Sequence, residues 1–164
     1  MNPTPQTAPV PRLIRADQGN RIINVHDEVT FKLTGPDTGG VFALGLATTQ
    51  PGGGPPPHRH SREDELFIVV EGEIQCGTVN GWLTARAGDV VYLPAGSVHT
   101  FHNASDAVAK HWILVTPPGF ETFFERFTNV LNAAQGGAPD MAALHAAAGD
   151  FGIDLLPPHA LPAR

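Results

Sequence analysis

The sequence has very little cysteine and no long apolar runs. Of its 164 residues only Cys76 is a cysteine, so an intrachain disulfide is impossible and the class of secreted disulfide scaffolds is excluded. No apolar run approaches the roughly 18 residues of a membrane-spanning helix. The start, MNPTPQTAPV, lacks the charged and apolar regions of a secretory signal peptide. We therefore expect a soluble, cytoplasmic protein with no membrane partner.

Charged residues are also scarce. They make up 16% of the chain, against about 25% in an average protein, while 41% of the residues are hydrophobic, so a disordered chain is excluded. Ten basic and sixteen acidic side chains give a formal charge of −6, and lysine and arginine form no stripe. A nucleic-acid partner would require such a basic surface, so this class of partner is excluded as well.

Glycine and proline are abundant instead, with 18 and 16 residues, which is typical of short elements joined by tight turns. Nine short β-rich runs are expected, at 21–24, 29–33, 41–49, 65–71, 73–79, 82–86, 89–93, 99–103 and 107–116. Asn80-Gly81 between two of them is a common hairpin signal. Because no helix separates these runs, the pattern predicts an antiparallel sandwich or barrel.

The chain divides into three parts by composition. Residues 1–20 are a proline-rich N-terminal arm, residues 21–117 form the β-barrel, and residues 118–164 form C-terminal helices and an extended tail that pack on the barrel. Phe120, Phe123, Phe124, Phe127 and Leu131 make one apolar stripe at helical spacing, which predicts a helix that covers a barrel face. A second helix is expected over 139–148, with Gly149 as its stop.

Three histidines and one glutamate have the spacing of a metal site. His58 and His60 lie two residues apart, so on a strand both imidazoles project to the same face. Glu65 begins the next apolar run, and His99 follows a tight turn that can bring a third imidazole beside the first two. Three imidazoles and one carboxylate suit a divalent transition-metal ion, which is Fe, Mn, Ni, Co, Cu or Zn, and leave positions open for substrate.

These residues stand in two motifs that resemble those of the cupin superfamily. The first is Gly52, five residues, His58, one, His60, four, Glu65, six, Gly72. The second is Gly88, five residues, Pro94, one, Gly96, two, His99, three, Asn103. The resemblance implies an all-β cupin jelly-roll (double-stranded β-helix) barrel with C-terminal α-helices. It also implies that His58, His60, Glu65 and His99 bind the metal and that the protein is a homodimer.

The segments GPDTGG, PGGGPPPHRH and TPPGFETFFERF look more narrowly like single-domain, quercetinase-like cupins. That resemblance implies a dioxygenase that combines O2 with a small aromatic or enol-containing compound. Glu65 would accept the proton of the metal-bound substrate as well as bind the ion. Two alternatives stay open: a metal-dependent isomerase or lyase of a small carbonyl compound, and a cupin that binds a small molecule without catalysis.

Strand alternation predicts which neighbours share the site. If Glu65 points inward, Phe67 and Val69 do so too, and Phe101 shares the inward face of His99. We expect these three apolar residues to line the substrate pocket. Glu63 and Asp64 are expected to face solvent, since they belong to the connecting loop.

Other polar residues have structural explanations. Asn103 is expected to hold backbone near the barrel end, and Cys76 to act as a small apolar residue within a strand. His102 has the opposite strand parity to His99 and is expected to be exposed or packed, and His111 has no partner at ligand spacing, so no metal role is expected for it.

Overall fold

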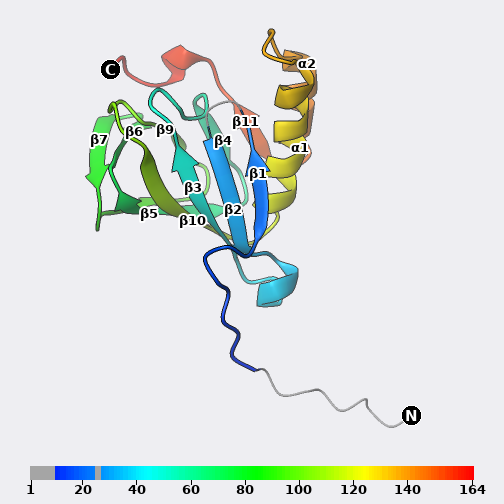
Figure 1. The fold of residues 1–164 in the computed structure, drawn as a ribbon. Helices are drawn as coiled ribbons and strands as arrows, with labels where there is room; N and C mark the ends of the chain where they lie inside the picture. Colours follow the sequence, from blue (N-terminus) through cyan, green and yellow to red (C-terminus); the bar gives the residue numbers. More distant parts are fainter. Residues whose placement is uncertain (1–9, 25–26) are drawn as a thin grey trace.

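A computed structural model describes residues 10–24 and 27–164, so residues 1–9 of the predicted arm lie outside the described part. Within that part, eleven strands form two antiparallel sheets, and two α-helices follow at the C-terminal end (Figure 1). The six-stranded sheet has the order β1 (Asn20–Ile23), β2 (Asp27–Leu33), β3 (Ala43–Thr49), β10 (Ala109–Thr116), β5 (Asp64–Glu71) and β8 (Val90–Leu93). The five-stranded sheet has the order β11 (Ile153–Leu155), β4 (His58–His60), β9 (Val98–His102), β6 (Glu73–Thr78) and β7 (Gly81–Arg86).

The nine predicted β-runs all form strands, with ends that shift by one or two residues. The predicted hairpin is confirmed, since β6 and β7 pair with Thr78 opposite Gly81. Two short strands were not expected. One is β4, which carries the first two histidines, and the other is β11 in the tail, which pairs with β4 residue by residue. Pairing between segments almost a hundred residues apart leaves no local signal in the sequence.

The core lies between the two sheets. Alternate residues of β3 and β10 are buried, as expected for strands with one face turned inward. Phe67 of β5 meets Phe101 of β9 edge to face, with ring centroids 5.4 Å apart. Since these strands belong to different sheets, the contact joins the two layers across the interior.

The helices cover one side of this sandwich, beside β1 and β11 (Figure 1). Helix α1 (Phe120–Ala133) follows the predicted apolar stripe and buries Phe120 and Phe123. Helix α2 (Met141–Gly149) begins two residues later than expected, because the Asp140 carboxylate caps it by accepting a hydrogen bond from the Ala143 amide. Gly149 is the last helical residue and not the stop. Two 3₁₀ turns, Pro36–Thr38 and Pro158–Ala160, complete the elements. Among the described residues, no helix has both the length and the apolar character needed to span a membrane.

Candidate metal centre

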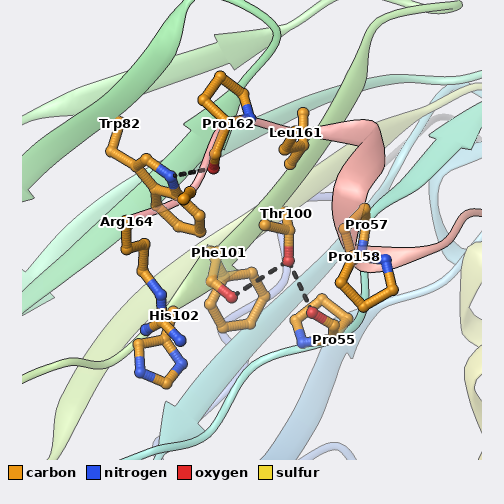
Figure 2. Close-up of a pocket in the computed structure, with 11 residues that line it drawn as sticks. Pro55, Pro57, Trp82, Thr100, Phe101, His102, Pro158, Leu161, Pro162 and Arg164 are labelled. Atoms are coloured by element: carbon orange, nitrogen blue, oxygen red, sulfur yellow. Dashed lines mark hydrogen bonds between the residues drawn. The ribbon is translucent and has the colours of Figure 1, made fainter.

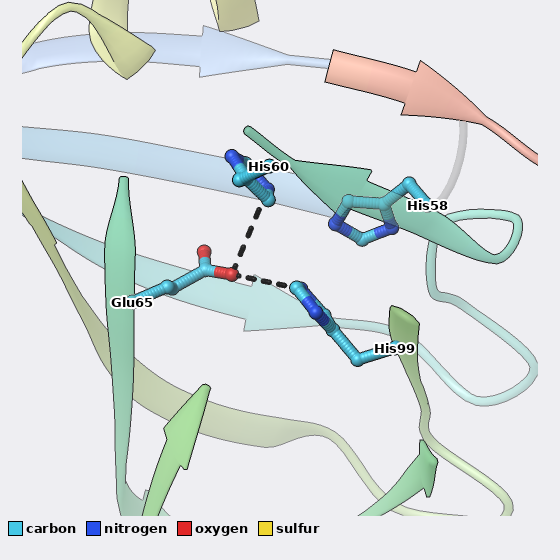
Figure 3. A group of neighbouring side chains, drawn as sticks. All are labelled: His58, His60, Glu65 and His99. Carbon is cyan, nitrogen blue, oxygen red and sulfur yellow. Dashed lines mark hydrogen bonds and ion pairs between the residues drawn. The ribbon is translucent and has the colours of Figure 1, made fainter. Parts of the chain in front are cut away.

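The four side chains predicted to bind metal lie together in the interior (Figure 3). One ligand atom from each of His58, His60, Glu65 and His99 falls within 4.8 Å of every other. Exposure is 8% for His58 and 2% or less for the other three. The four side chains therefore form one buried cluster, as the sequence predicted.

Strand register brings the imidazoles together. In β4, the buried His58 and His60 alternate with the exposed Arg59. Strand β9 pairs with β4 so that His99 lies directly opposite His58, and their ring centroids are 4.4 Å apart. Glu65 comes from β5 in the other sheet. The cluster thus joins the two layers, and the carboxylate approaches from the side opposite the imidazole-bearing sheet.

The approach to β4 is fixed by a close backbone contact. Gly54 has φ +137°, and a Cβ atom there would lie 2.1 Å from the carbonyl oxygen of Phe101. Only glycine fits, because this φ value and this distance both exclude a side chain. The glycine-rich segment can therefore lie against the end of β9 before it enters β4 at His58.

Two of the imidazoles are oriented by nearby backbone carbonyls. Nδ1 of His58 lies 3.0 Å from the carbonyl oxygen of Pro56, and Nδ1 of His99 lies 3.1 Å from that of Ser97. A carbonyl oxygen can only accept, so Nδ1 carries the hydrogen in both rings and Nε2 is the atom directed to the cluster. Nε2 of His99 is 3.2 Å from Oε2 of Glu65.

Glu63 corrects the sequence interpretation. It was expected to face solvent, yet only 6% of it is exposed, and its Oε2 lies 3.5 Å from Nδ1 of His60. Asp64 is the first residue of β5 and is partly buried, where it accepts hydrogen bonds from the Tyr92 hydroxyl and the Ala95 amide. The missed signal was the spacing of Glu63, three residues after the candidate ligand His60.

Burial and neighbouring charges set the ionisation of the cluster. Burial, with a smaller contribution from the other two imidazoles, lowers the pKa of His58 to about 3, so this ring is neutral. Burial acts in the same direction on His60, but the carboxylates of Glu63 and Glu65 outweigh it and raise the pKa of that ring. Burial alone would raise the pKa of Glu65, whereas its close contact with the His99 ring and the other nearby imidazoles bring it below its usual range. Glu65 is therefore ionised and His58 is neutral, as metal ligands must be.

The donor set fits a divalent transition-metal ion. Neither ring nitrogen of the buried His60 has a hydrogen-bond partner, which is costly unless another group satisfies them. Imidazole nitrogens and one carboxylate are ligands that Zn, Fe, Mn, Co, Ni and Cu ions accept. The cluster could hold such an ion through His58, His60, Glu65 and His99, and its chemistry does not select one metal.

An apolar wall adjoins the cluster. Phe67 and Val69 are 1% exposed and Phe101 is 8% exposed, so all three residues predicted for the pocket are buried. The ring of Phe120, from α1, lies 5.5 Å from that of His60 and covers the cluster on the helical side. Cys76 is buried, and burial raises the pKa of its thiol to about 12, which agrees with the expected apolar role.

His111, for which no metal role was expected, is a polar member of this wall. It is fully buried on β10 and contacts Phe67 and Phe101 at ring-centroid distances of 5.0 and 4.8 Å. Burial lowers its pKa to about 4, and neither ring nitrogen has a partner. Its inward parity with Ile113 was the available signal. Asn103, as expected, holds backbone by donating to the carbonyls of Thr49 and Ala107.

A separate hollow of about 260 Å³ lies on the outer face of β9 (Figure 2). Thr100, Phe101 and His102 of β9 line it. The C-terminal tail borders the hollow, and the Trp82 indole donates a hydrogen bond to the Pro162 carbonyl there. None of the four cluster residues lines this hollow, so it is distinct from the candidate metal centre.

Comparisons with known proteins agree with this geometry. Residues 45–116, which include all four cluster residues, match the Cupin domain family. Beta-D-galactosidase Rv1717 from Mycobacterium tuberculosis is 34% identical over 116 residues, which cover 65% of this chain and 95% of that protein. Germin-like protein 9-1 from Oryza sativa is 41% identical over 63 residues, and this chain spans less than half the length of such germin-like relatives.

Solved cupin structures have the same fold. A sugar phosphate isomerase of the cupin superfamily from Silicibacter pomeroyi matches 64% of this chain and 75% of its own, with a TM-score of 0.57 and 24% identity. KdgF from Halomonas sp. matches 69% of this chain and 99% of its own, with a TM-score of 0.60 and 14% identity. At these identities the likeness concerns the fold alone. Together with the family match and the mycobacterial relative, it establishes that this chain belongs to the cupin family.

Proposed function

We propose that this protein is a metal-dependent dioxygenase, similar to the quercetinases, that combines O2 with a small aromatic or enol-containing compound. One observation carries the proposal: a buried carboxylate contacts two imidazoles beside a wall of aromatic side chains. We also propose that the two sheets form a jelly-roll barrel, because the candidate ligand side chains come from both sheets and meet in the interior.

His58, His60, His99 and Glu65 would hold the ion. When bound, a divalent ion would supply positive charge that lowers the pKa of a substrate hydroxyl or enol. Glu65 would accept the released proton, because its Oε2 lies on the side of the His60 and His99 Nε2 atoms. Glu63 does not serve this step, since it faces the opposite nitrogen of His60.

The wall would select the substrate. Phe67, Val69 and Phe101 offer apolar contacts, and Phe67 and Phe101 can pack against an aromatic ring. Phe120 would limit the entry of water on the helical side. Exclusion of water strengthens the electrostatic effect of every charge inside the site.

A second candidate is cleavage of a β-D-galactoside. It is favoured by the name of the mycobacterial relative and by the 95% of that protein that this chain covers. A sugar calls for several inward hydrogen-bonding groups, whereas Phe67, Val69 and Phe101 supply none and His111 is the one polar side chain described in this wall. For this reason we place the dioxygenase first.

One panel of assays separates the possibilities. The metal-loaded protein would be mixed with a flavonol, a β-diketone, nitrophenyl β-D-galactoside and a ketose, while an oxygen electrode records O2. Uptake with the flavonol or diketone would support the dioxygenase. Release of nitrophenol would favour the galactosidase, conversion without uptake would indicate an isomerase or lyase, and binding without turnover would indicate a non-catalytic module. The last three outcomes contradict our proposal.

A further inference from the structure

Glu63 is a buried carboxylate, and the turn that contains it supplies no hydrogen bond to its Oε2. It ends the short connection between β4 and β5, and 6% of it is exposed. Its Oε2 has no hydrogen-bond partner, and the described ion pair that it makes is with Nδ1 of His60 at 3.5 Å. Burial of a carboxylate is unfavourable unless a specific interaction compensates for it. The compensating group has to be found at His60.

Each of the three imidazoles of the cluster has an oxygen atom near its Nδ1. His58 and His99 each direct Nδ1 to the carbonyl two residues earlier and Nε2 to the cluster. His60 has no such carbonyl partner for Nδ1, and the Glu63 carboxylate occupies the corresponding place. Its Nε2 faces Glu65 at 3.8 Å, so His60 has one carboxylate on each side of its ring.

We infer that Glu63 is a positioning residue for His60: it holds the Nδ1–H and thereby directs Nε2 of this ligand to the ion. This inference rests on the metal binding of the proposed function but not on its chemistry. A carboxylate that accepts the hydrogen bond from Nδ1 fixes the tautomer of the ring. It also makes Nε2 a stronger metal ligand than a carbonyl acceptor in the same place would. It also supplies a second negative charge, so that Glu63 and Glu65 together balance a divalent ion.

The experiment compares Glu63→Gln with the parent chain and with Glu71→Gln as the control. Both substitutions remove one negative charge and keep the side-chain shape, but Glu71 is exposed on β5 and pairs with Lys110, far from the cluster in register. The dissociation constant of Co²⁺ would be measured for each apo protein by competition with a chelator. We expect Glu63→Gln to weaken Co²⁺ binding about ten- to hundredfold and Glu71→Gln to change it less than about twofold. Equal affinities of Glu63→Gln and the parent would overturn the inference.

A second measurement does not depend on the folding of a variant. Long-range ¹H–¹⁵N spectra of the apo parent, at a pH where the ring is neutral, report which nitrogen of His60 carries the hydrogen. Hydrogen on Nδ1 supports the inference, and hydrogen on Nε2 overturns it. Glu63→Asp, which keeps the charge but shortens the side chain, should recover part of the Co²⁺ affinity; no recovery would count against the inference.

The outcomes also separate this inference from the proposed function. A parent that binds Co²⁺ more tightly than Glu63→Gln, yet takes up no O2 with any compound, would refute the dioxygenase and leave the role of Glu63 intact. A parent that takes up O2 but binds Co²⁺ no better than Glu63→Gln would support the dioxygenase and refute the role of Glu63.

Discussion

Binding of a divalent ion should release protons, and the structure limits their number. His60 must lose its proton to bind, and its pKa lies above the ordinary 6.5, because the Glu63 and Glu65 carboxylates outweigh the effect of burial. At pH 5 this ring is protonated in the apo protein and releases one proton. His58, with a pKa of about 3, has none to release. Of these two rings, His60 alone should therefore release a proton when the ion binds at pH 5.

This number sets the pH dependence of binding. Each released proton makes the apparent dissociation constant change about tenfold per pH unit, which corresponds to about 1.4 kcal/mol. Release of this proton from His60 should raise the affinity about tenfold between pH 5 and 6. Three imidazoles with ordinary pKa values would give nearly a thousandfold change well below their pKa. Affinity falls as pH decreases, because the proton and the ion compete for the same nitrogen of His60.

Titration calorimetry of the apo protein with Co²⁺ at pH 5 measures the release directly. The experiment is repeated in two buffers with different ionisation enthalpies, and the difference in observed heat gives the number of protons. A value near three would show that His58 is protonated in the apo protein and that the described burial is wrong. A value near zero would show that His60 is neutral and that its two carboxylates do not act on it.

Four substitutions test other parts of the site. His58→Ala should leave well under one ion per chain after dialysis, as measured by plasma emission, and an unchanged content would contradict its role as a ligand. At full metal loading, Glu65→Gln should lower turnover about a hundredfold or more, and turnover equal to that of the parent would exclude it as the proton acceptor. Phe120→Ala removes the ring that covers His60 and should lower the free energy of unfolding in urea by about 3–5 kcal/mol; a loss under about 1 kcal/mol would mean that α1 is not packed as described. His111→Leu removes a buried imidazole without partners and should raise that free energy by about 1 kcal/mol, so that a clear decrease would reveal an unrecognised partner.

The fold was predictable as far as local patterns determine it. Alternation of apolar residues and the turn signals located all nine expected strands, and the phenylalanine stripe located α1. Strand β11 was not predictable, because its three residues form a strand only by pairing with His58–His60. The expected homodimer and the division at residues 20 and 117 stay predictions.

In the candidate site, too, the features set by local sequence were predictable and those set by long-range packing were not. Its four candidate ligand side chains could be predicted to lie together because each motif carries its own geometry, with two histidines on one strand and a third after a tight turn. Glu63 was misplaced because a charged residue in a connection is usually solvated, and only the fold reveals that the connection turns inward onto His60. His111 was set aside because it lacks ligand spacing, whereas its contacts with aromatic rings arise from three separate strands.

Residues inside the motifs and residues outside them should have different roles in substrate selection. The anchors of His58 and His99 are carbonyls two residues away, so they accompany the motif into any chain that has it. Phe120 and His111 lie outside both motifs and reach the site only through the packing of α1 and the register of β10. Two cupins can therefore share the cluster and differ in what covers it. If the motifs hold the ion and these outer residues decide which compound reaches it, substitutions at Phe120 and His111 should change the preferred substrate without changing the number of ions bound, which is the opposite of what substitution of His58 should do.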